Sequence, residues 1–103
     1  MSKLNINILN QLIIKWADER NLIEGSTSQA QFVKLIEEAG ELANSIAKKK
    51  DVKDDLGDMF VVMSIIAEQQ GVSMQEAIEK AWDDIKDRKG KMVDGVFIKE
   101  SDL

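Results

Sequence analysis

The chain contains no cysteine, no histidine and no proline, and its only aromatic residues are three phenylalanines and two tryptophans. Without cysteine and histidine it cannot build the usual zinc site, a histidine-activated nucleophile or a redox dithiol. Any catalysis must therefore depend on carboxylates, lysine, arginine, hydroxyl groups or a hard metal ion.

Acidic residues outnumber basic ones by 19 to 14, so the formal net charge is −5. This balance argues against bulk binding to the phosphate backbone of nucleic acid, which needs a basic surface, but it leaves a small phosphorylated ligand possible. The segment from Met1 to Asn5 lacks the basic and apolar blocks of a secretory signal, and no apolar run reaches the length of a membrane span. We therefore expect a soluble, cytoplasmic protein without a membrane partner.

The length of 103 residues predicts a single domain over residues 1–103. Apolar residues recur at i, i+3 and i+4 in four segments, which predicts an all-α, four-helix chain. The expected helices cover Ile6 to Arg20, residues 28–48, residues 51–70 and a segment from about Ser73 to about Lys89. The third segment is apolar nearly all round, so we expect it to be the most buried helix.

Capping patterns support these boundaries. Ser28 with Gln31 and Ser73 with Glu76 each have the spacing of a capping box, and Gly90 is placed to cap the end of the fourth helix. The tail over residues 91–98 contains an Asp-Gly pair, which is compatible with a short hairpin or with an extended arm.

Two carboxylate pairs stand among apolar residues at i, i+3 spacing: Glu38 with Glu41, and Asp55 with Asp58. Residues three apart lie on one face of a helix. If the second and third helices form an antiparallel hairpin, Glu41/Asp55 and Glu38/Asp58 share a midpoint at Lys48, where the lysine-rich turn is expected. The two pairs should then face each other.

Four facing carboxylates predict a divalent cation, and Mg²⁺ is the preferred candidate with Mn²⁺ as a substitute, because both accept hard oxygen ligands. A bound cation would also offset the repulsion among the grouped acids. One such pair alone is more typical of a solvated helix face, or of acids that favour a helix N-terminus. Two pairs spaced to face each other favour the metal site.

A glycine precedes the last acid of each pair, at Gly40 and Gly57. Glycine inside a helix costs about 1 kcal/mol relative to alanine. Tight helix crossing and a role at the metal site are equally good explanations of this cost.

These residues also resemble a known family, the MazG-like, all-α nucleoside triphosphate pyrophosphohydrolases. The resemblance rests on Glu-Glu-x-x-Glu at 37–41 and an acid-x-x-Asp at 55–58, and it extends through the segments 34–36, 42–43, 56–59 and 87–97. One departure is that Asp55 stands where the family usually has glutamate, so that ligand reaches about one methylene less far.

The resemblance implies Mg²⁺-dependent hydrolysis of a (deoxy)nucleoside triphosphate to the monophosphate and pyrophosphate, in a nucleotide-pool house-cleaning role. It implies Glu38, Glu41, Asp55 and Asp58 as metal ligands and Glu37 with Glu38 as catalytic residues. In such a site the triphosphate is the substrate, and one acid serves as general base without the sequence indicating which one.

Cationic and aromatic groups are candidates for binding the substrate. Lys80, Asp84 and Arg88 are candidates for the nucleotide, although a solvated face is the alternative for such charges near a helix end. Trp16 and Trp82 could stack on a base, but an aromatic residue at helical spacing is more often part of a core. We retain Trp16 as the candidate.

So small a chain would bury more apolar surface by pairing with itself, and we expect a homodimer or homotetramer. The rival hypothesis is a non-enzymatic helical dimerisation or interaction module with a structural divalent-cation site. It explains the helices and the charge, but it does not explain why four acids should face one another. An EF-hand is excluded because no twelve-residue loop carries the required ligand spacing.

Overall fold

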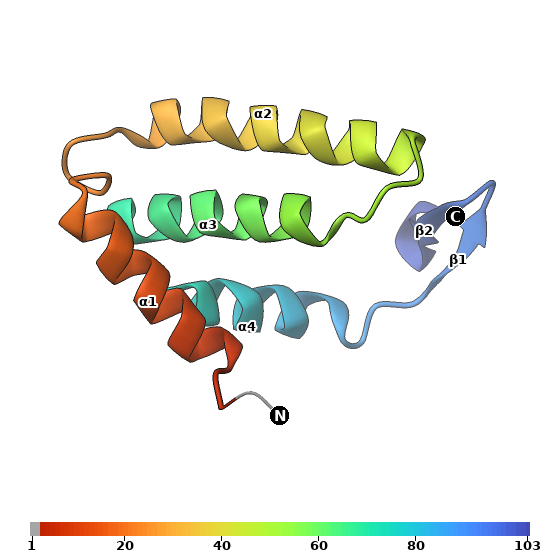
Figure 1. Cartoon of the computed structure of the whole chain (residues 1–103). Coiled ribbons are helices and arrows are strands. Elements are labelled where there is room, and N and C mark those ends of the chain that lie inside the picture. The colour runs from red at the N-terminus through yellow and green to blue at the C-terminus, as the bar shows by residue number, and fades with distance from the viewer. Residues whose placement is uncertain (1–2) are drawn as a thin grey trace.

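The computed structural model describes residues 3–103 and is mainly helical (Figure 1). The elements, in order, are α1 (Ile6–Glu19), α2 (Ser28–Ala47), α3 (Lys53–Gln69), α4 (Met74–Ile85), β1 (Gly90–Val93), β2 (Val96–Lys99) and the 3₁₀ turn η1 (Glu100–Asp102). The prediction of four helices is confirmed, and of the two alternatives for the tail the hairpin is the correct one.

The centre of the fold is the antiparallel pair α2 and α3, with α1 lying across α3 (Figure 1). The connection after α2 turns at Lys48 to Lys50, where Lys49 adopts a left-handed conformation with φ of 56°. The fold point predicted at Lys48 is therefore confirmed. It brings the second half of α2 beside the first half of α3.

Most of the buried side chains belong to α3, as its continuous apolar sequence predicts. Val62, Ser64, Ile65 and Ala67 are buried, and Ala17 of α1 is fully covered. Since α1 and α2 both pack on α3, this helix is the axis that positions the other two.

A buried polar pair fixes α1 on α3. Asn10 Nδ2 donates to Ser64 Oγ at 2.8 Å, and the same hydroxyl donates to the Phe60 carbonyl at 2.8 Å. Asn10 is 7% exposed and Ser64 is inaccessible. Because buried polar groups need partners, this contact favours one register of α1 over neighbouring ones.

The predicted capping box at Ser28 is wrong. Thr27 is the N-cap, and its hydroxyl accepts from Ala30 N at 3.1 Å. The Ser28 hydroxyl instead donates to Gln69 Oε1 at 3.0 Å, and Gln31 donates to Ser26. A hydroxyl residue stands at both 27 and 28, and the contact with the end of α3 decides which one caps.

The capping box of Ser73 and Glu76 is confirmed at the start of α4. The end of this helix was placed too late, because α4 stops at Ile85 and Gly90 begins a strand. Gly90 pairs with Lys99, and a Cβ at position 90 would collide with the Ile98 carbonyl oxygen. The glycine is therefore required by the close approach of the two strands.

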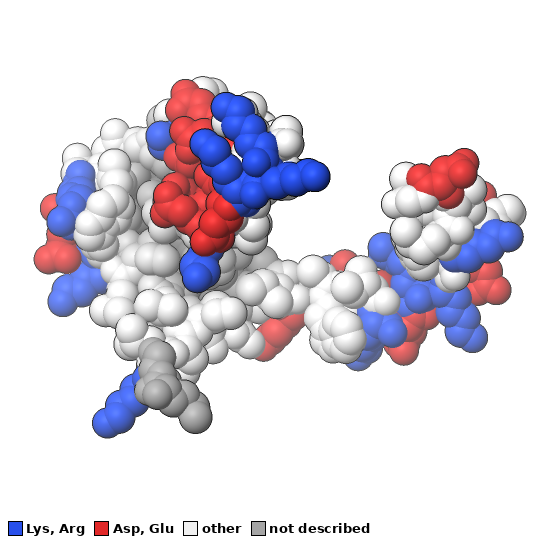
Figure 2. Space-filling view, turned by 45° about the vertical axis from the view of Figure 1, so that its right-hand side comes forward, with Lys and Arg blue, Asp and Glu red and all other residues white. Residues whose placement is uncertain are grey.

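The hairpin turns at Asp94 and Gly95, with φ of 50° and 82°. Two positive φ values at the centre of a two-residue loop are typical of the turns that match strand twist. Figures 1 and 2 both show the hairpin standing away from the helices α1 to α3. Over residues 3–103, no helix has both the length and the apolar character needed to cross a bilayer.

We expect Asn10→Ala to lower the free energy of unfolding by about 0.5 to 1.5 kcal/mol, because it removes one buried hydrogen bond while the Ser64 hydroxyl keeps its bond to the Phe60 carbonyl. Urea unfolding followed by circular dichroism measures this change. Ser101→Ala, on the exposed η1 turn, serves as the control and should leave the stability unchanged. Equal stability of the Asn10→Ala variant and the parent would contradict the assigned role of the pair.

Candidate metal centre

Three of the four predicted ligands meet between α2 and α3. Carboxylate oxygens of Glu38 and Glu41, from α2, and Asp58, from α3, all lie within 4.8 Å of one another. The acids gather on one face of the helical body, with basic side chains beside them (Figure 2). The prediction that the two carboxylate segments converge is confirmed for these three residues.

Glu38 is the inner member of the group. It is 6% exposed, and its Oε1 forms an ion pair with Lys34 Nζ at a distance of 3.3 Å. Its Oε2 is buried without a hydrogen-bond partner. A buried carboxylate oxygen without a donor is costly, and a cation would supply the missing interaction. The donor set of hard oxygens therefore fits a divalent ion of the Mg²⁺ class.

The crowding of acids changes their proton affinity. A side-chain hydrogen bond with Glu38, and then the negative charge of Glu38, raise the pKa of Glu41 above its usual value. Burial is the main cause of the raised pKa of Asp58, followed by the negative charges of Asp54, Glu38 and Asp55. Both pKa values are raised because the group contains more negative charge than the nearby positive charge of the protein neutralises.

Asp55 is close to the group but is not among the three residues that converge. Its negative charge contributes to the raised pKa of both Glu41 and Asp58. Asp55 also lies in the first turn of α3, where an acid favours the helix dipole. A ligand role for Asp55 stays a prediction, and its short side chain favours contact through water.

Glu37 is not one of the three converging acids. Its side chain is 61% exposed, and its Oε2 lies 3.7 Å from Lys34 Nζ. A role in orienting water at the edge of the site stays a prediction.

Lys34 is the residue that the sequence interpretation missed as a part of this site. It lies between Glu37 and Glu38, and its hydrogen bond with Glu38 raises the pKa of the lysine. The available signal was the i, i+4 spacing of Lys34 and Glu38 on α2, which places the two side chains on one helix face. In this arrangement the ammonium group acts as the counter-ion of the buried acid.

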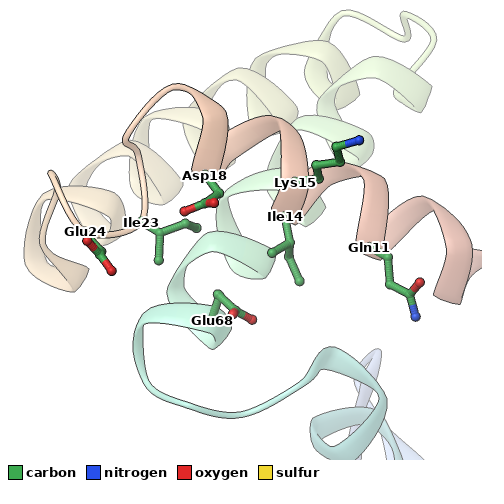
Figure 3. A pocket seen from close by; sticks show the side chains of 7 residues that line it. All are labelled: Gln11, Ile14, Lys15, Asp18, Ile23, Glu24 and Glu68. Atoms are coloured by element: carbon green, nitrogen blue, oxygen red, sulfur yellow. The ribbon is translucent and has the colours of Figure 1, made fainter.

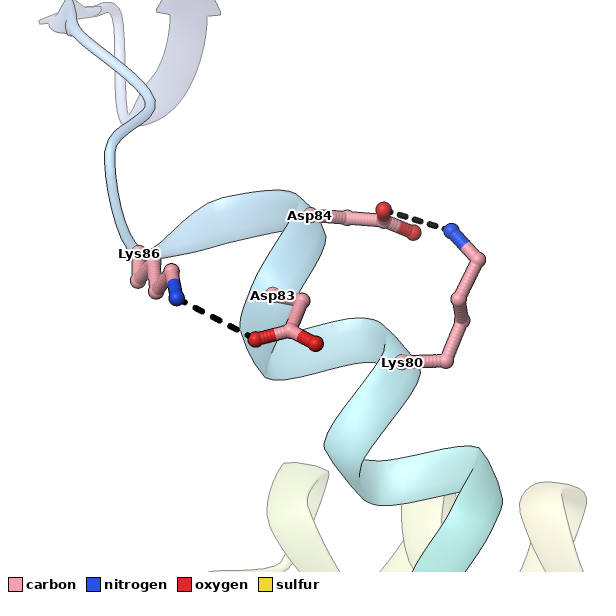
Figure 4. Close-up of polar contacts among 4 residues, drawn as sticks. All are labelled: Lys80, Asp83, Asp84 and Lys86. Carbon is pink, nitrogen blue, oxygen red and sulfur yellow. Dashed lines mark hydrogen bonds and ion pairs between the residues drawn. The ribbon is translucent and has the colours of Figure 1, made fainter.

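The predicted substrate-binding charges lie on a different part of the chain. Lys80 Nζ binds Asp84 Oδ1 at 2.6 Å on the exposed surface of α4, and the neighbouring pair Lys86 and Asp83 spans 3.2 Å (Figure 4). Arg88 lines a separate cleft between α4 and the hairpin. Within residues 3–103, no ion pair links Lys80, Asp84 or Arg88 to the carboxylate group, so their substrate role stays a prediction.

Trp16 lies closer to the candidate metal centre. It borders an apolar cleft of about 450 Å³ that also contains Asp58, and the cleft is lined by Leu9, Leu12, Ile13, Trp16, Asp58 and Val61. The guanidinium of Arg20 lies 4.6 Å from the centre of the tryptophan ring. The ring therefore lies in the same cleft as one of the three converging acids, and its role in stacking on a base stays a prediction.

Another cleft lies between α1 and the far end of α3, and Figure 3 shows its side chains. It has a volume of about 510 Å³ and is lined by Gln11, Ile14, Lys15, Asp18, Ile23, Glu24 and Glu68. None of the predicted site residues borders it, so cavity size alone does not locate the candidate site.

The residues 26–93 match the MazG nucleotide pyrophosphohydrolase domain. This span contains α2, α3, α4 and β1, and so includes the three converging acids. The chain belongs to this family. The predicted family resemblance and the all-α fold of the MazG domain are thereby confirmed.

A protein of Haemophilus phage HP1, described as an uncharacterized 18.2 kDa protein in the rep-hol intergenic region, is 53% identical over 62 residues. The match covers 58% of this chain and 38% of the phage protein. The chain thus spans little more than a third of the length of this relative. No solved structure matches the chain significantly.

The raised pKa values of Glu41 and Asp58 make the folding stability of the chain depend on pH. The folded chain binds protons at Glu41 and Asp58 more tightly than the unfolded chain, so these groups lower stability as pH rises through their ordinary values of 4.5 and 3.8. The loss is complete once pH exceeds the raised values. We expect Mg²⁺ to raise the melting temperature at neutral pH, and progressively less as the pH is lowered to about 4, because protons then compete with the ion for Glu41 and Asp58.

Asp58→Asn is the variant that tests this pH dependence in thermal melts. It should be more stable than the parent at neutral pH without metal, and it should lose most of the response to Mg²⁺. Glu19→Asn, on the exposed surface of α1, is the control for removing one negative charge. An unchanged Mg²⁺ response in Asp58→Asn would contradict the site.

Lys34→Met tests the counter-ion. We expect it to lower the metal-free melting temperature, because the buried Glu38 loses its partner, and to increase the affinity for Mg²⁺ by several fold, because no ammonium competes with the ion. Isothermal titration calorimetry and thermal melts measure the two effects. Lys15→Met on α1 removes the same charge away from the acids, and equal behaviour of the two variants would show that Lys34 acts only through net charge.

Proposed function

We propose that this chain hydrolyses a nucleoside triphosphate to the monophosphate and pyrophosphate in the presence of Mg²⁺. The observation that carries the proposal is the convergence of the Glu38, Glu41 and Asp58 carboxylates, one of which, Glu38, has a buried oxygen without a hydrogen-bond partner. Membership of the MazG nucleotide pyrophosphohydrolase domain family supports the reaction class.

The three convergent carboxylates would hold the cation, and Asp55 would add a ligand through water. When bound, a divalent ion clamps phosphate oxygens, neutralises developing charge and lowers the pKa of a bound water. The residues of the chain do the rest: α2 and α3 fix the acids on rigid helices, so that their directions are set before substrate arrives.

The reaction is an in-line displacement at the α-phosphorus. A water oxygen forms the new bond, the bond from that phosphorus to the α,β-bridging oxygen breaks, and pyrophosphate leaves with the electron pair. A carboxylate accepts the proton of the water, and the candidates for this step are the exposed Glu37 and the buried Glu38. Lys34, once displaced from Glu38, is free to pair with a phosphate oxygen.

The nucleoside would lie in the apolar cleft beside Asp58, with Trp16 against the base. The exposed pair Lys80 and Asp84, together with Arg88, remains proposed for the triphosphate. A house-cleaning role would require a preference for a non-canonical nucleotide over the canonical ones.

Pyrophosphate release from a panel of canonical, deoxy and damaged nucleoside triphosphates tests this proposal. With Mg²⁺ at least one member should be hydrolysed, and Glu38→Gln and Asp58→Asn should lower kcat/KM by at least about 100-fold. Glu19→Gln is the matched control and should retain the activity. Absence of turnover across the panel, or full activity in the two folded site variants, would overturn the proposal.

The same variants separate the enzyme from a non-enzymatic interaction module. A module with a structural cation would bind Mg²⁺ and lose that binding in Asp58→Asn, but it would release no pyrophosphate. Activity that requires the acids, combined with Mn²⁺ able to replace Mg²⁺, is expected only of the enzyme.

A further inference from the structure

The connection between α2 and α3 carries positive charge that no acid of the chain neutralises. Within six residues it contains four exposed lysines: Lys48, Lys49, Lys50 and Lys53. Over residues 3–103, no ion pair joins any of the four to an acid. By contrast, Lys80 and Lys86 on α4 each bind an aspartate (Figure 4). The lysines of the connection are therefore available to a ligand.

The local backbone explains only a part of this charge. Lys48 follows the last residue of α2, where the helix dipole favours a positive group. Lys53 opens α3, where the same dipole disfavours it. Lys49 has a φ of 56°, a left-handed conformation that glycine adopts more readily and that commonly follows a helix. Since two of these positions do not favour lysine, the positive charge itself needs an explanation.

The lysines, the acids and the apolar cleft follow one another along the α2 and α3 pair. Lys48 comes seven residues after Glu41, so it lies two helical turns, or about 10 Å, farther along the same side of α2. The cleft that contains Trp16 is lined from α3 by Asp58 and Val61, so it extends from the acids away from the connection. Basic side chains gather beside the acids on the helical body (Figure 2). The acids thus separate a basic end from an apolar cleft.

We propose that Lys48, Lys49 and Lys50, here called the lysine turn, form a subsite for the terminal phosphates of the nucleotide. The subsite rests on the proposed function. With the nucleoside in the cleft and the α-phosphate at the acids, the β- and γ-phosphates continue toward the lysine turn. A lysine ammonium is a compact charge on a flexible stem and binds phosphate as a point charge. After cleavage, the group that remains against the lysine turn is pyrophosphate.

The subsite makes the number of phosphates a basis for selecting the substrate. Asp58 is the one charged residue among those that line the apolar cleft, so the cleft offers few polar partners to a base. Three lysines attract a triphosphate more strongly than a diphosphate or a monophosphate, because the ligand charge increases with each phosphate.

Isothermal titration calorimetry of inorganic pyrophosphate into the Mg²⁺-loaded chain tests the subsite without turnover. The triple variant Lys48→Gln, Lys49→Gln and Lys50→Gln should bind pyrophosphate about 10-fold or more weakly than the parent, because three charge contacts are lost. Equal affinity of this folded variant and the parent, or no pyrophosphate binding by the parent, would overturn the subsite.

A charge-matched control removes three lysines elsewhere, by Lys3→Gln, Lys15→Gln and Lys91→Gln. It should keep the pyrophosphate affinity within about 2-fold, because distant exposed charges are screened by salt. An equal loss of affinity in both triple variants would show that only net charge acts. Pyrophosphate binding that is unchanged after EDTA removes Mg²⁺ would indicate a general polyanion surface. Either result would contradict a subsite that extends from the acids.

Lys49→Gly separates the charge from the backbone conformation. Glycine removes the strain of a left-handed lysine, so the melting temperature should rise. The pyrophosphate affinity should fall by a few fold at the same time. Weaker binding by a more stable chain cannot result from a damaged fold, whereas a Lys49→Gly variant with full affinity would remove Lys49 from the subsite and contradict the proposal as stated.

Amide chemical shifts measured by NMR locate the ligand. When pyrophosphate is added in the presence of Mg²⁺, the largest changes outside the acidic group should occur at residues 48–50. Changes at Lys80 and Arg88, with the lysine turn unaffected, would place the terminal phosphates on α4 and overturn the proposal.

The subsite and the proposed function can fail separately. If the parent hydrolyses nucleotide, the lysine-turn triple variant should raise KM with little change in kcat, the pattern of a lost binding contact. Hydrolysis with an unchanged KM would contradict the subsite and leave the proposed function standing. A parent that binds pyrophosphate through the lysine turn but hydrolyses no nucleotide would contradict the proposed function and leave pyrophosphate binding at the turn established.

Discussion

The structure depends on a buried carboxylate held between two antiparallel helices. Glu38 faces inward from α2 where the packing with α3 is close, and the protein compensates only one of its two oxygens, through Lys34. Burying a carboxylate without full compensation is expensive, so a sequence that keeps this arrangement gains something other than stability. The acidic cluster that Glu38 forms with Glu41 and Asp58 is consistent with a divalent metal site, which would explain the arrangement and fits the MazG nucleotide pyrophosphohydrolase domain family.

Two features of the rest of the chain affect the surroundings of the acidic group between α2 and α3. The Asn10 and Ser64 pair sets the position of α1 on α3, and thereby the position of the apolar cleft beside Asp58. The α4 helix has no buried residue, and the strands of the hairpin are also largely exposed. The apolar side chains of both elements are therefore in contact with water. A site with its acids on one rigid pair of helices and its open side toward unpartnered surface is suited to completion by another molecule.

Sequence periodicity predicted the four helices and the turn at Lys48 well, because an apolar face repeated every three to four residues leaves little choice of secondary structure. It failed where two local solutions compete. Both Thr27 and Ser28 can cap α2, and only the contact of Ser28 with Gln69 decides between them. Likewise Gly90 can end a helix or begin a strand, and its pairing with Lys99 decides for the strand.

By itself, the sequence determined the helical fold, the exclusion of histidine and cysteine chemistry, and the two acid pairs on facing helix surfaces. These follow from composition and from spacing along one or two helices, which are local properties. Only the tertiary structure decided that Glu38, Glu41 and Asp58 form the tight group while Asp55 lies beside it, and that Lys34 is the counter-ion. Those outcomes depend on side-chain burial and on distances across the α2 and α3 contact, and residue spacing does not contain either quantity.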